Sequence, residues 1–462
     1  MIRNFIGILV AFLALFSLSS CKTTHFFGSN QSSDAAHTKT PQNTKPSVPA
    51  DLALQGDPAT IWKHLQKTPV AKLQSTLNKT SDPTEKGWLT LAMTYQNYHQ
   101  NTKSLVDQLQ HWRKENPNHP ALSLIPNDAI LSQLSQNPYP KHIALLLPLK
   151  GQFSAQGQMV RDGFLSAYYE TLSKNPGQTV TFYDTSRTSN IYSLYQKAIS
   201  NGSDMIVGPL TKENVSELSQ QNRYPVTTIA LNYTDQTLPK NFFEFGLSPK
   251  DEAIQLAIKA REMGYANAII IAPKDDWSQR IAKPLLTEWQ KSGGKIVDSY
   301  YYPSRAKFAE DIPTLLHVDS KNISKTKIAE ARRKDFDAIF LIAQPDDGRE
   351  IVPLLKYYEA SNIPIFSTSV IYSGIPSPEK DHHLNGIIFC DIPWVLHKNA
   401  KGLSNRLYAV GRDAALLSNE LPRLSQLPNF PINAATGTLT LSSSQHIYRQ
   451  VPWTEMRNGH PE

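Results

Sequence analysis

The chain has 462 residues, of which 40% are hydrophobic, and this length is too great for one ordinary core, so we expect two or three domains. Its net charge is +7, yet the basic residues do not cluster, and the densest stretch, residues 325–334, also contains Glu330 and indicates the solvated face of a helix. A nucleic-acid partner is therefore disfavoured, and two cysteines are too few for a disulfide framework.

The first 21 residues have the three parts of a secretory signal. Arg3 supplies positive charge, and residues 5–18 form an apolar run of about 14 residues, shorter than the ~20 residues that a membrane-spanning helix needs. The sequence Leu18-Ser19-Ser20-Cys21 resembles the bacterial lipobox, in which the cysteine thiol accepts diacylglycerol. We expect residues 1–20 to be a lipoprotein signal peptide and Cys21 to be lipidated. The alternative is an ordinary signal peptide with a chance cysteine.

Residues 21–50 would then carry the lipid and a tether. In lipoprotein sorting as known from enteric bacteria, an aspartate after the cysteine favours the inner membrane, so Lys22 indicates the outer membrane. Residues 22–50 are rich in Ser, Thr, Asn, Gln, Lys and Pro and cannot bury enough apolar surface to offset the entropy of ordering. We expect a disordered tether that could stretch to roughly 100 Å.

Residues 51–137 have the pattern of short amphipathic helices. Two longer helices are predicted over residues 84–99 and 102–115, because apolar residues recur there at helical spacing. Antiparallel pairs of this size resemble a tetratricopeptide-type (TPR-like) solenoid, but the stretch holds scarcely two repeats, whereas about three are usually needed. We therefore expect this all-α region to pack against the next domain for stability. The alternative is a small helical bundle.

From residue 141 to residue 462 the chain alternates short apolar strands with helices, beginning with a strand at residues 142–147. This alternation is typical of parallel sheets that helices cover on both faces. A second set of strands and helices begins near the helix predicted over residues 251–263. The sequence therefore predicts an α/β fold with two lobes, each a doubly wound parallel sheet. Cys390 ends an apolar strand and is expected to be a packed, unreactive thiol.

Nine residues fall just after the predicted strands and are candidates for a cleft between the lobes. Ligands of doubly wound sheets bind at the carboxyl ends of the strands, which is the reason for selecting them. Each residue also has an ordinary explanation in turn or helix-cap chemistry. The candidates are Ser154, Thr185, Pro209, Leu210, Thr211, Asn232, Trp277, Gln344 and Asp346.

The sequence argues against an enzyme. It has no Gly-x-Ser-x-Gly, His-Glu-x-x-His, Cys-x-x-Cys or phosphate-loop motif. The adjacent His382 and His383 do not have metal-ligand spacing and indicate solvated loop residues. The acidic pairs at residues 275–276 and 346–347 follow strands and precede helices, which favours helix N-capping. We therefore expect no catalytic residue, no metal and no cofactor other than the covalent lipid.

Several segments resemble a known family. The start of the α/β region, residues 143–149 followed by Gly151-Gln152-Phe153 and Gly163-Phe164, looks like that of a type I periplasmic binding protein. More specific segments resemble the penicillin-binding protein activator LpoA family, and the match covers about residues 141–453. These segments are IVGPL at 206–210, ALN at 230–232, FGLSP at 245–249, RLYAVGRDA at 406–414, TGTLTL at 436–441, IYR at 447–449 and VPW at 451–453.

The resemblance implies a type I periplasmic-binding-protein-like fold and a non-catalytic function. A member of this family would be an outer-membrane lipoprotein, close to peptidoglycan, that binds a class A penicillin-binding protein and stimulates transpeptidation. The helical region looks shorter than in the enteric members. A solute-binding or sensory lipoprotein with a ligand in the inter-lobe cleft is the alternative. We expect partner contacts on the α/β domain, with the loops at residues 373–383 and 423–435 as candidates.

Overall fold

The computed structural model describes residue 52 and residues 54–136, 139–318, 328–397 and 405–462. The predicted signal peptide, Cys21 and the tether lie outside these residues. Across the described ranges, no helix combines the length and the apolar character that a membrane crossing requires. All described residues belong to one compact unit, Val48–Glu462.

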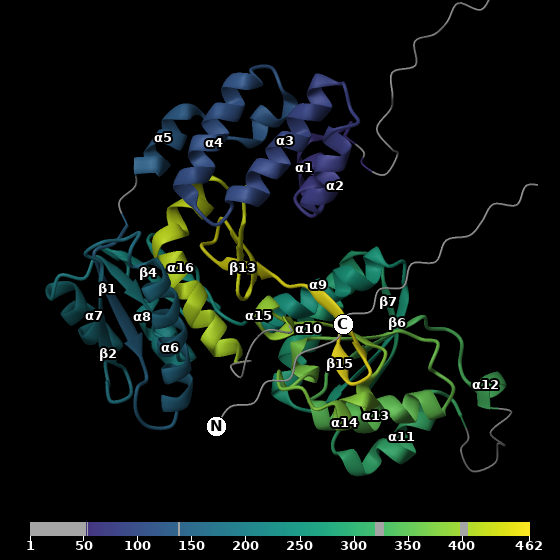
Figure 1. Cartoon of the computed structure of the whole chain (residues 1–462). Helices are drawn as coiled ribbons and strands as arrows, with labels where there is room; N and C mark the ends of the chain where they lie inside the picture. The colour runs from purple at the N-terminus through teal and green to yellow at the C-terminus, as the bar shows by residue number, and fades with distance from the viewer. Residues whose placement is uncertain (1–51, 53, 137–138, 319–327, 398–404) are drawn as a thin grey trace, which may run out of the picture. The chain divides into compact units, whose positions relative to one another are not determined.

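Short helices form the amino-terminal helical region (Figure 1). They are α1 (Pro58–Leu65), α2 (Val70–Leu77), α3 (Pro83–Tyr98), α4 (Thr102–Glu115), the 3-10 helix η1 (Pro120–Leu124) and α5 (Asp128–Gln136). The helices predicted over residues 84–99 and 102–115 are confirmed as α3 and α4. Asp57 and Asp82 cap α1 and α3 by accepting backbone N–H groups of the first turn, and a proline follows each of them.

The helical region rests on a segment from near the end of the chain. Phe430 belongs to the same apolar core as the tryptophans of this region. Trp62 donates its indole N–H to the carbonyl oxygen of Asn429 at 2.6 Å, and the Tyr95 hydroxyl donates to the carbonyl oxygen two residues further on at 3.1 Å. The expectation that residues 423–435 form an exposed loop is therefore wrong, because much of this segment is buried against the helical region.

Lobe 1 is a five-stranded parallel sheet with the order β2-β1-β3-β4-β5. Its strands are β1 (His142–Leu147), β2 (Thr179–Asp184), β3 (Met205–Val207), β4 (Thr227–Ala230) and β5 (Phe242–Glu244). Its first helices are α6 (Ser154–Thr171), α7 (Ile191–Ser200) and α8 (Lys212–Leu218). β1 is an inner strand whose last five residues are buried, which explains its continuous apolar sequence.

Lobe 2 contains a seven-stranded sheet with the order β15-β14-β10-β9-β8-β6-β7, in which β14 runs antiparallel to β10. Its strands are β6 (Asn267–Pro273), β7 (Lys295–Tyr302), β8 (Ala338–Leu341), β9 (Ile365–Ser367), β10 (Ile387–Cys390), β14 (Trp453–Arg457) and β15 (His460–Pro461). Its α-helices are α9 (Pro249–Glu262), α10 (Asp276–Lys291), α11 (Phe308–Leu315), α12 (Ile328–Ala331), α13 (Pro345–Tyr357), α14 (Pro378–Asp381) and α15 (Pro393–Leu396). The prediction of two lobes with parallel sheets is confirmed.

Two expectations for side chains of lobe 2 have different outcomes. Cys390 is fully buried and unpaired at the end of β10, and burial raises the pKa of its thiol well above the ordinary value, as expected of a packed cysteine. The solvated helix face expected at residues 325–334 is wrong for Arg333. Its side chain is 7% exposed and pairs with Asp298 and Asp335 at 2.6 and 2.8 Å.

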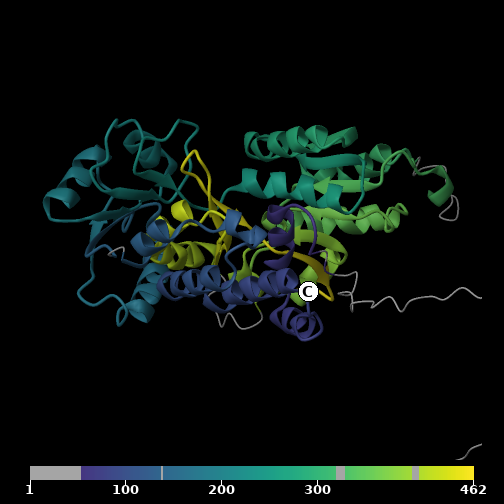
Figure 2. The same cartoon turned by 90° about the horizontal axis from the view of Figure 1, so that it is seen from above.

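The chain passes between the lobes at three places. It leaves β5 for α9, returns from lobe 2 through α16 (Arg406–Gln426), and leaves lobe 1 again before β14. Between α16 and β14 lies a three-stranded antiparallel sheet, the crossover sheet, made of β11 (Ile432–Ala434), β12 (Gly437–Leu441) and β13 (Ile447–Gln450). Figures 1 and 2 show α16 and the crossover sheet beside the helical region.

Candidate functional site

The return of the chain to lobe 1 depends on glycines where α6 and α16 touch. A Cβ atom on Gly163 would lie 1.9 Å from the carbonyl oxygen of Tyr408. A Cβ atom on Gly411 would lie 2.0 Å from the carbonyl oxygen of Val160. Only glycine lets the two backbones approach so closely. These contacts fix α16, and with it the crossover sheet that follows it, on lobe 1.

Asp413 of α16 holds the crossover sheet. Its buried carboxylate accepts hydrogen bonds from the backbone N–H groups of Ala435 (2.8 Å) and Thr436 (2.7 Å) and from the Thr436 hydroxyl (2.6 Å). Burial raises the pKa of Asp413 to about 6, although these donors act in the opposite direction. The turn between β11 and β12 is therefore attached to α16 through a single side chain.

Arg449 of β13 connects the crossover sheet to both lobes. Its buried guanidinium donates to the carbonyl oxygens of Gly246, which follows β5, at 2.7 Å and of Thr436 at 3.2 Å. It also lies 3.6 Å from the carboxylate of Glu252 in α9. Glu252 in turn accepts a hydrogen bond from the hydroxyl of Ser369, which follows β9, at 2.7 Å. One arginine thus links lobe 1, lobe 2 and the sheet between them.

A second buried pair completes this connection. The Arg406 guanidinium, at the start of α16, donates to the fully buried carboxylate of Asp391 at 2.9 Å and to the carbonyl oxygen of Tyr372 at 2.9 Å. Burial raises the pKa of Asp391, and Arg406 opposes this rise. Buried charges are tolerated only when they are paired in this way. We call this set the hinge network: Glu252, Asp391, Arg406, Asp413 and Arg449.

The predicted cleft residues of lobe 1 follow the carboxyl ends of parallel strands and therefore share one edge of the sheet. Ser154 is the first residue of α6, and Thr211 caps α8 through the backbone N–H of Asn214. Pro209 and Leu210 are buried after β3. Asn232 donates a hydrogen bond to the carbonyl oxygen of Leu210 at 3.0 Å. By contrast, the buried hydroxyl of Thr185 has no hydrogen-bond partner within the described chain.

The predicted cleft residues of lobe 2 are Trp277, Gln344 and Asp346. Trp277 is half-buried against the core of the lobe, and Gln344 is exposed at the start of α13. Asp346 pairs with Arg349 at 2.6 Å and lies 3.8 Å from Arg305.

The N-capping expected of residues 346–347 is wrong. Gln344 occupies the cap position of α13, and the carboxylate of Asp347 instead pairs with Arg305 and accepts a hydrogen bond from the Tyr302 hydroxyl at 2.7 Å. Asp275, by contrast, caps α10 as expected, accepting the backbone N–H of Ser278 at 2.7 Å.

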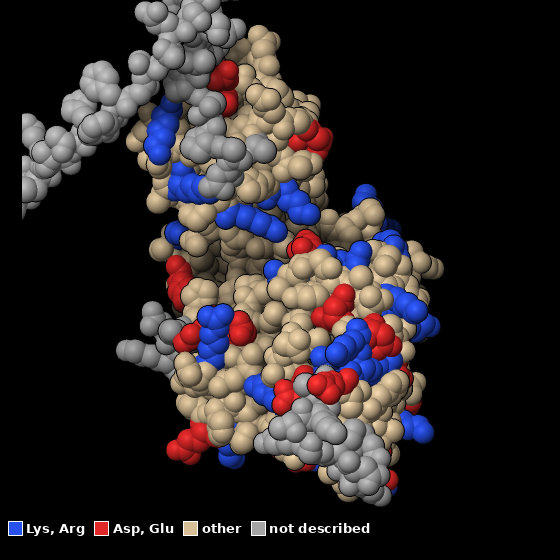
Figure 3. Space-filling view, turned by 90° about the vertical axis from the view of Figure 1, so that its right-hand side faces the viewer, with Lys and Arg blue, Asp and Glu red and all other residues tan. Residues whose placement is uncertain are grey.

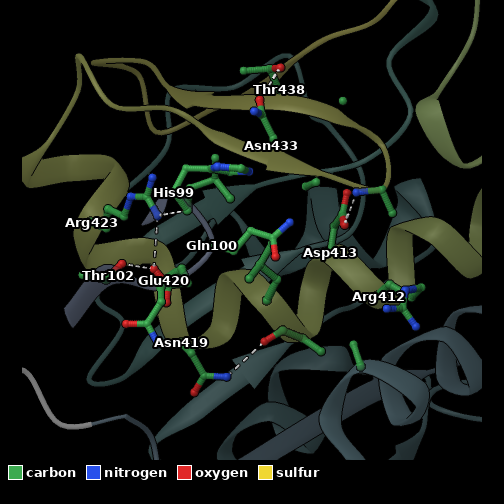
Figure 4. Close-up of a pocket in the computed structure, with 18 of the residues that line it drawn as sticks. His99, Gln100, Thr102, Arg412, Asp413, Asn419, Glu420, Arg423, Asn433 and Thr438 are labelled. Carbon is green, nitrogen blue, oxygen red and sulfur yellow. Dashed lines mark hydrogen bonds and ion pairs between the residues drawn. The ribbon is translucent and has the colours of Figure 1, made fainter. Parts of the chain in front are cut away.

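A cavity of about 1620 Å³ lies where the helical region, lobe 1 and the crossover sheet meet. None of the nine predicted cleft residues lines it. Its walls come from the α3–α4 turn, α5, α6, α15, α16, all three strands of the crossover sheet and the segment before β14. Figure 4 shows His99, Thr102, Glu420 and Arg423 at one end and Arg412 and Asp413 at the other. We call it the junction cavity.

Several charged groups of the junction cavity are already paired. Arg412 binds Glu170 of α6 at 2.7 Å and stacks on Trp394, with 5.0 Å between the guanidinium and the ring centroid. The hydrogen bond from Arg412 lowers the pKa of Glu170. At the other end, Glu420 accepts a hydrogen bond from the Thr102 hydroxyl and lies 3.9 Å from Arg423. Burial raises the pKa of Glu420.

Comparison with known proteins assigns the family. A family model matches residues 29–459, nearly the whole chain. The chain belongs to the LppC lipoprotein family. Among relatives, the penicillin-binding protein activator LpoA of Vibrio antiquarius is 30% identical over 431 residues, covering 86% of this chain and 70% of the relative. The LpoA of Photobacterium profundum is 29% identical over 422 residues, covering 85% and 68%.

Solved structures agree with this LppC assignment. Full-length LpoA from Haemophilus influenzae has a TM-score of 0.59 and 27% identity, covering 87% of this chain and 73% of that chain. The C-domain of LpoA from the same organism, a regulator of PBP1A, has a TM-score of 0.57 and 25% identity, covering 69% and 98%. The predicted family and the predicted type I periplasmic-binding-protein-like fold are confirmed.

The segments that carried the LppC family resemblance now have physical roles. RLYAVGRDA contains the glycine contact with α6 and the carboxylate that holds β12, while FGLSP, TGTLTL and IYR meet at Arg449. The junction cavity is different, because nothing in the local sequence predicts it. Its walls come from segments more than 300 residues apart, such as Thr102 and Glu420.

No metal centre is found among the residues that the structure describes, since no group of three or more His, Cys, Asp or Glu side chains could hold an ion there. His382 and His383 are exposed on the 3-10 helix η5 (His382–Leu384), as expected of solvated residues.

Proposed function

We propose that this chain is a non-catalytic lipoprotein of the outer membrane that binds a class A penicillin-binding protein and stimulates its peptidoglycan transpeptidase. The observation that carries the proposal is the match to the Vibrio antiquarius activator over 86% of the chain. The likeness to full-length Haemophilus influenzae LpoA supports it, because it extends over the helical region as well as both lobes. The relatives are activators of an enzyme and not catalysts themselves.

Stimulation requires that the chain bind the active conformation of the enzyme more tightly than the inactive one. Couplings of this kind are typically about 1–3 kcal/mol, which corresponds to roughly 5–150-fold in equilibrium. The hinge network is suited to such coupling because Arg449 contacts both lobes, so a partner that spans the lobes would sense their relative position.

The location and domain organisation belong to the same proposal. Lipid on Cys21 would hold the chain in the outer membrane, and Lys22 after it supports that location. Residues 22–50 would act as a tether that lets residues 51–137 and the domain at 141–462 work near peptidoglycan at a distance from the lipid surface.

The test uses the full lipidated chain in detergent with a purified class A penicillin-binding protein. Crosslinking of peptide stems in polymerised lipid II is measured with and without the chain, and a class B enzyme serves as the control. We expect a saturable several-fold increase in crosslinking for the class A enzyme only. Absence of both binding and stimulation at micromolar concentrations would contradict the proposal.

A ligand in the cleft between the lobes is the second candidate function. The observation that favours it is the Thr185 hydroxyl, which is 4% exposed by residue and has no hydrogen-bond partner within the described chain. A buried hydroxyl without a partner is costly, and a polar ligand could supply one. Thermal-shift screening of amino acids, sugars and muropeptides would detect it, with Thr185→Val as the matched variant. A cleft ligand should lose its stabilising effect in that variant.

A further inference from the structure

The size and position of the junction cavity indicate a macromolecular occupant. Its volume of about 1620 Å³ exceeds the ~300–1,000 Å³ of ordinary small-molecule pockets. Figure 3 shows that the molecule is hollowed below the helical region, with Lys and Arg side chains along the helical side of the hollow. The cavity is therefore an open groove and not a closed pocket for a solute.

The charges that line the junction cavity and remain unpaired are all positive. Lys67 and Lys103 come from the helical region, and Lys174 follows α6 of lobe 1. Their ammonium groups make no ion pair or hydrogen bond with any part of the chain that the structure describes. The acidic side chains of the same cavity, Glu170 and Asp413 among them, already have donors. A carboxylate-rich occupant would match this pattern.

One wall of the junction cavity is the crossover sheet, to which Thr438 of β12, Gln450 of β13 and the edge strand β11 all contribute. β11 pairs with β12 on one side only, and all three of its residues line the cavity. An edge strand can pair with the backbone of an extended peptide, and side-chain contacts then add specificity. A glycan lacks the alternating N–H and C=O groups that such pairing needs, so the edge favours a polypeptide.

We propose that the junction cavity is the docking site for an extended, acidic segment of the partner enzyme. The inference rests on the proposed function, since it names the chemistry of the enzyme segment that binds. The chain's own residues 22–50 are a poor occupant, because they carry three lysines and a single aspartate and would be repelled by the cavity lysines.

The test compares two charge-reversed variants of the full chain. One carries Lys67→Glu, Lys103→Glu and Lys174→Glu. The matched control carries the same charge change at three other lysines, as Lys197→Glu, Lys283→Glu and Lys295→Glu. These lysines are exposed, make no ion pair in the described chain and do not line the cavity. Thermal unfolding of both variants first establishes that they are folded.

Binding of the class A enzyme is then measured at two salt concentrations. We expect the cavity variant to bind at least tenfold more weakly and to lose most of the salt dependence, because exposed charge pairs are screened at high ionic strength. The control variant should bind like the wild type. Equal affinity of the cavity variant and the wild type would overturn the docking site while leaving the proposed function intact.

A synthetic peptide tests the binding property of the junction cavity independently of which enzyme is the partner. A fluorescent dodecapeptide of alternating Glu and Thr should bind the wild type and not the cavity variant, and its Gln–Thr counterpart should bind neither. If the enzyme does not bind the wild type, the proposed function is wrong. Binding of the peptide probe then shows by itself whether the junction cavity accepts an acidic extended chain. Binding of a muropeptide that the cavity variant loses, with enzyme binding unchanged, would assign the cavity to glycan and overturn the inference.

Discussion

Replacing Asp413 with alanine should destabilise the chain measurably. The change leaves two backbone N–H groups and one hydroxyl buried without their acceptor, at about 1–3 kcal/mol each, or about 6 kcal/mol together. Removing a costly buried carboxylate offsets part of this loss. Its pKa rises from 3.8 to about 6, and a rise of about two units corresponds to about 3 kcal/mol at neutral pH. The expected net loss at pH 7 is therefore about 3 kcal/mol.

Calorimetry can measure this loss. Unfolding entropy is about 2.1 cal/mol/K per residue, so for a unit of about 400 residues 3 kcal/mol lowers Tm by roughly 3–4 °C. Asp162→Ala removes an exposed carboxylate of α6 that, within the described ranges, pairs only with its neighbour Arg161, and it should change Tm by less than about 1 °C.

The difference in stability between the wild type and Asp413→Ala should depend on pH in a defined direction. The pKa of Asp413 is raised in the folded state, so the stability contributed by its protonated form is complete below pH 3.8 and is lost as pH rises through about 6. The wild type should therefore exceed Asp413→Ala by more at pH 4.5 than at pH 7.5. A gap that widens toward pH 7.5 would refute this account of Asp413.

Three further predictions concern other parts of the chain. Gly163→Ala should lower the free energy of unfolding by about 1–3 kcal/mol in urea titrations, because its methyl group would overlap the carbonyl oxygen of Tyr408; an unchanged midpoint would show that α6 and α16 can separate freely. His446→Gln should lower Tm more at pH 6 than at pH 9, since Glu244 raises the pKa of His446 and the pair stabilises the fold only below that raised pKa. Cys21→Ala should leave the protein unprocessed or soluble, and a variant of normal mass in the outer-membrane fraction would contradict lipidation.

Local signals in the sequence predict the elements well. Apolar spacing locates α3 and α4, a continuous apolar run locates β1, and Asp57 and Asp275 mark the helix starts that they cap. The alternation of strands and helices predicts both lobes. These features depend on contacts within a few residues, which the order of residue types records directly.

The contacts that place the parts of the molecule are not local. Arg449 donates to Gly246, about 200 residues earlier, and Trp62 donates to Asn429, more than 360 residues later. Periodicity carries no information about such pairs, so the return of α16 to lobe 1, the burial of residues 423–435 and the junction cavity could not be predicted. Family resemblance marked several of the responsible segments without indicating what they do.

Lobe 1 is built from two stretches of chain that are synthesised far apart in time. Its strands come from residues 142–244, but α16 and the crossover sheet that cover it come from residues 406–450. The apolar core of the helical region is likewise incomplete until Phe430 is available to pack into it. A growing chain halted before residue 406 would therefore expose the side of α6 around Gly163, and its first half should stay sensitive to protease until the final segment arrives.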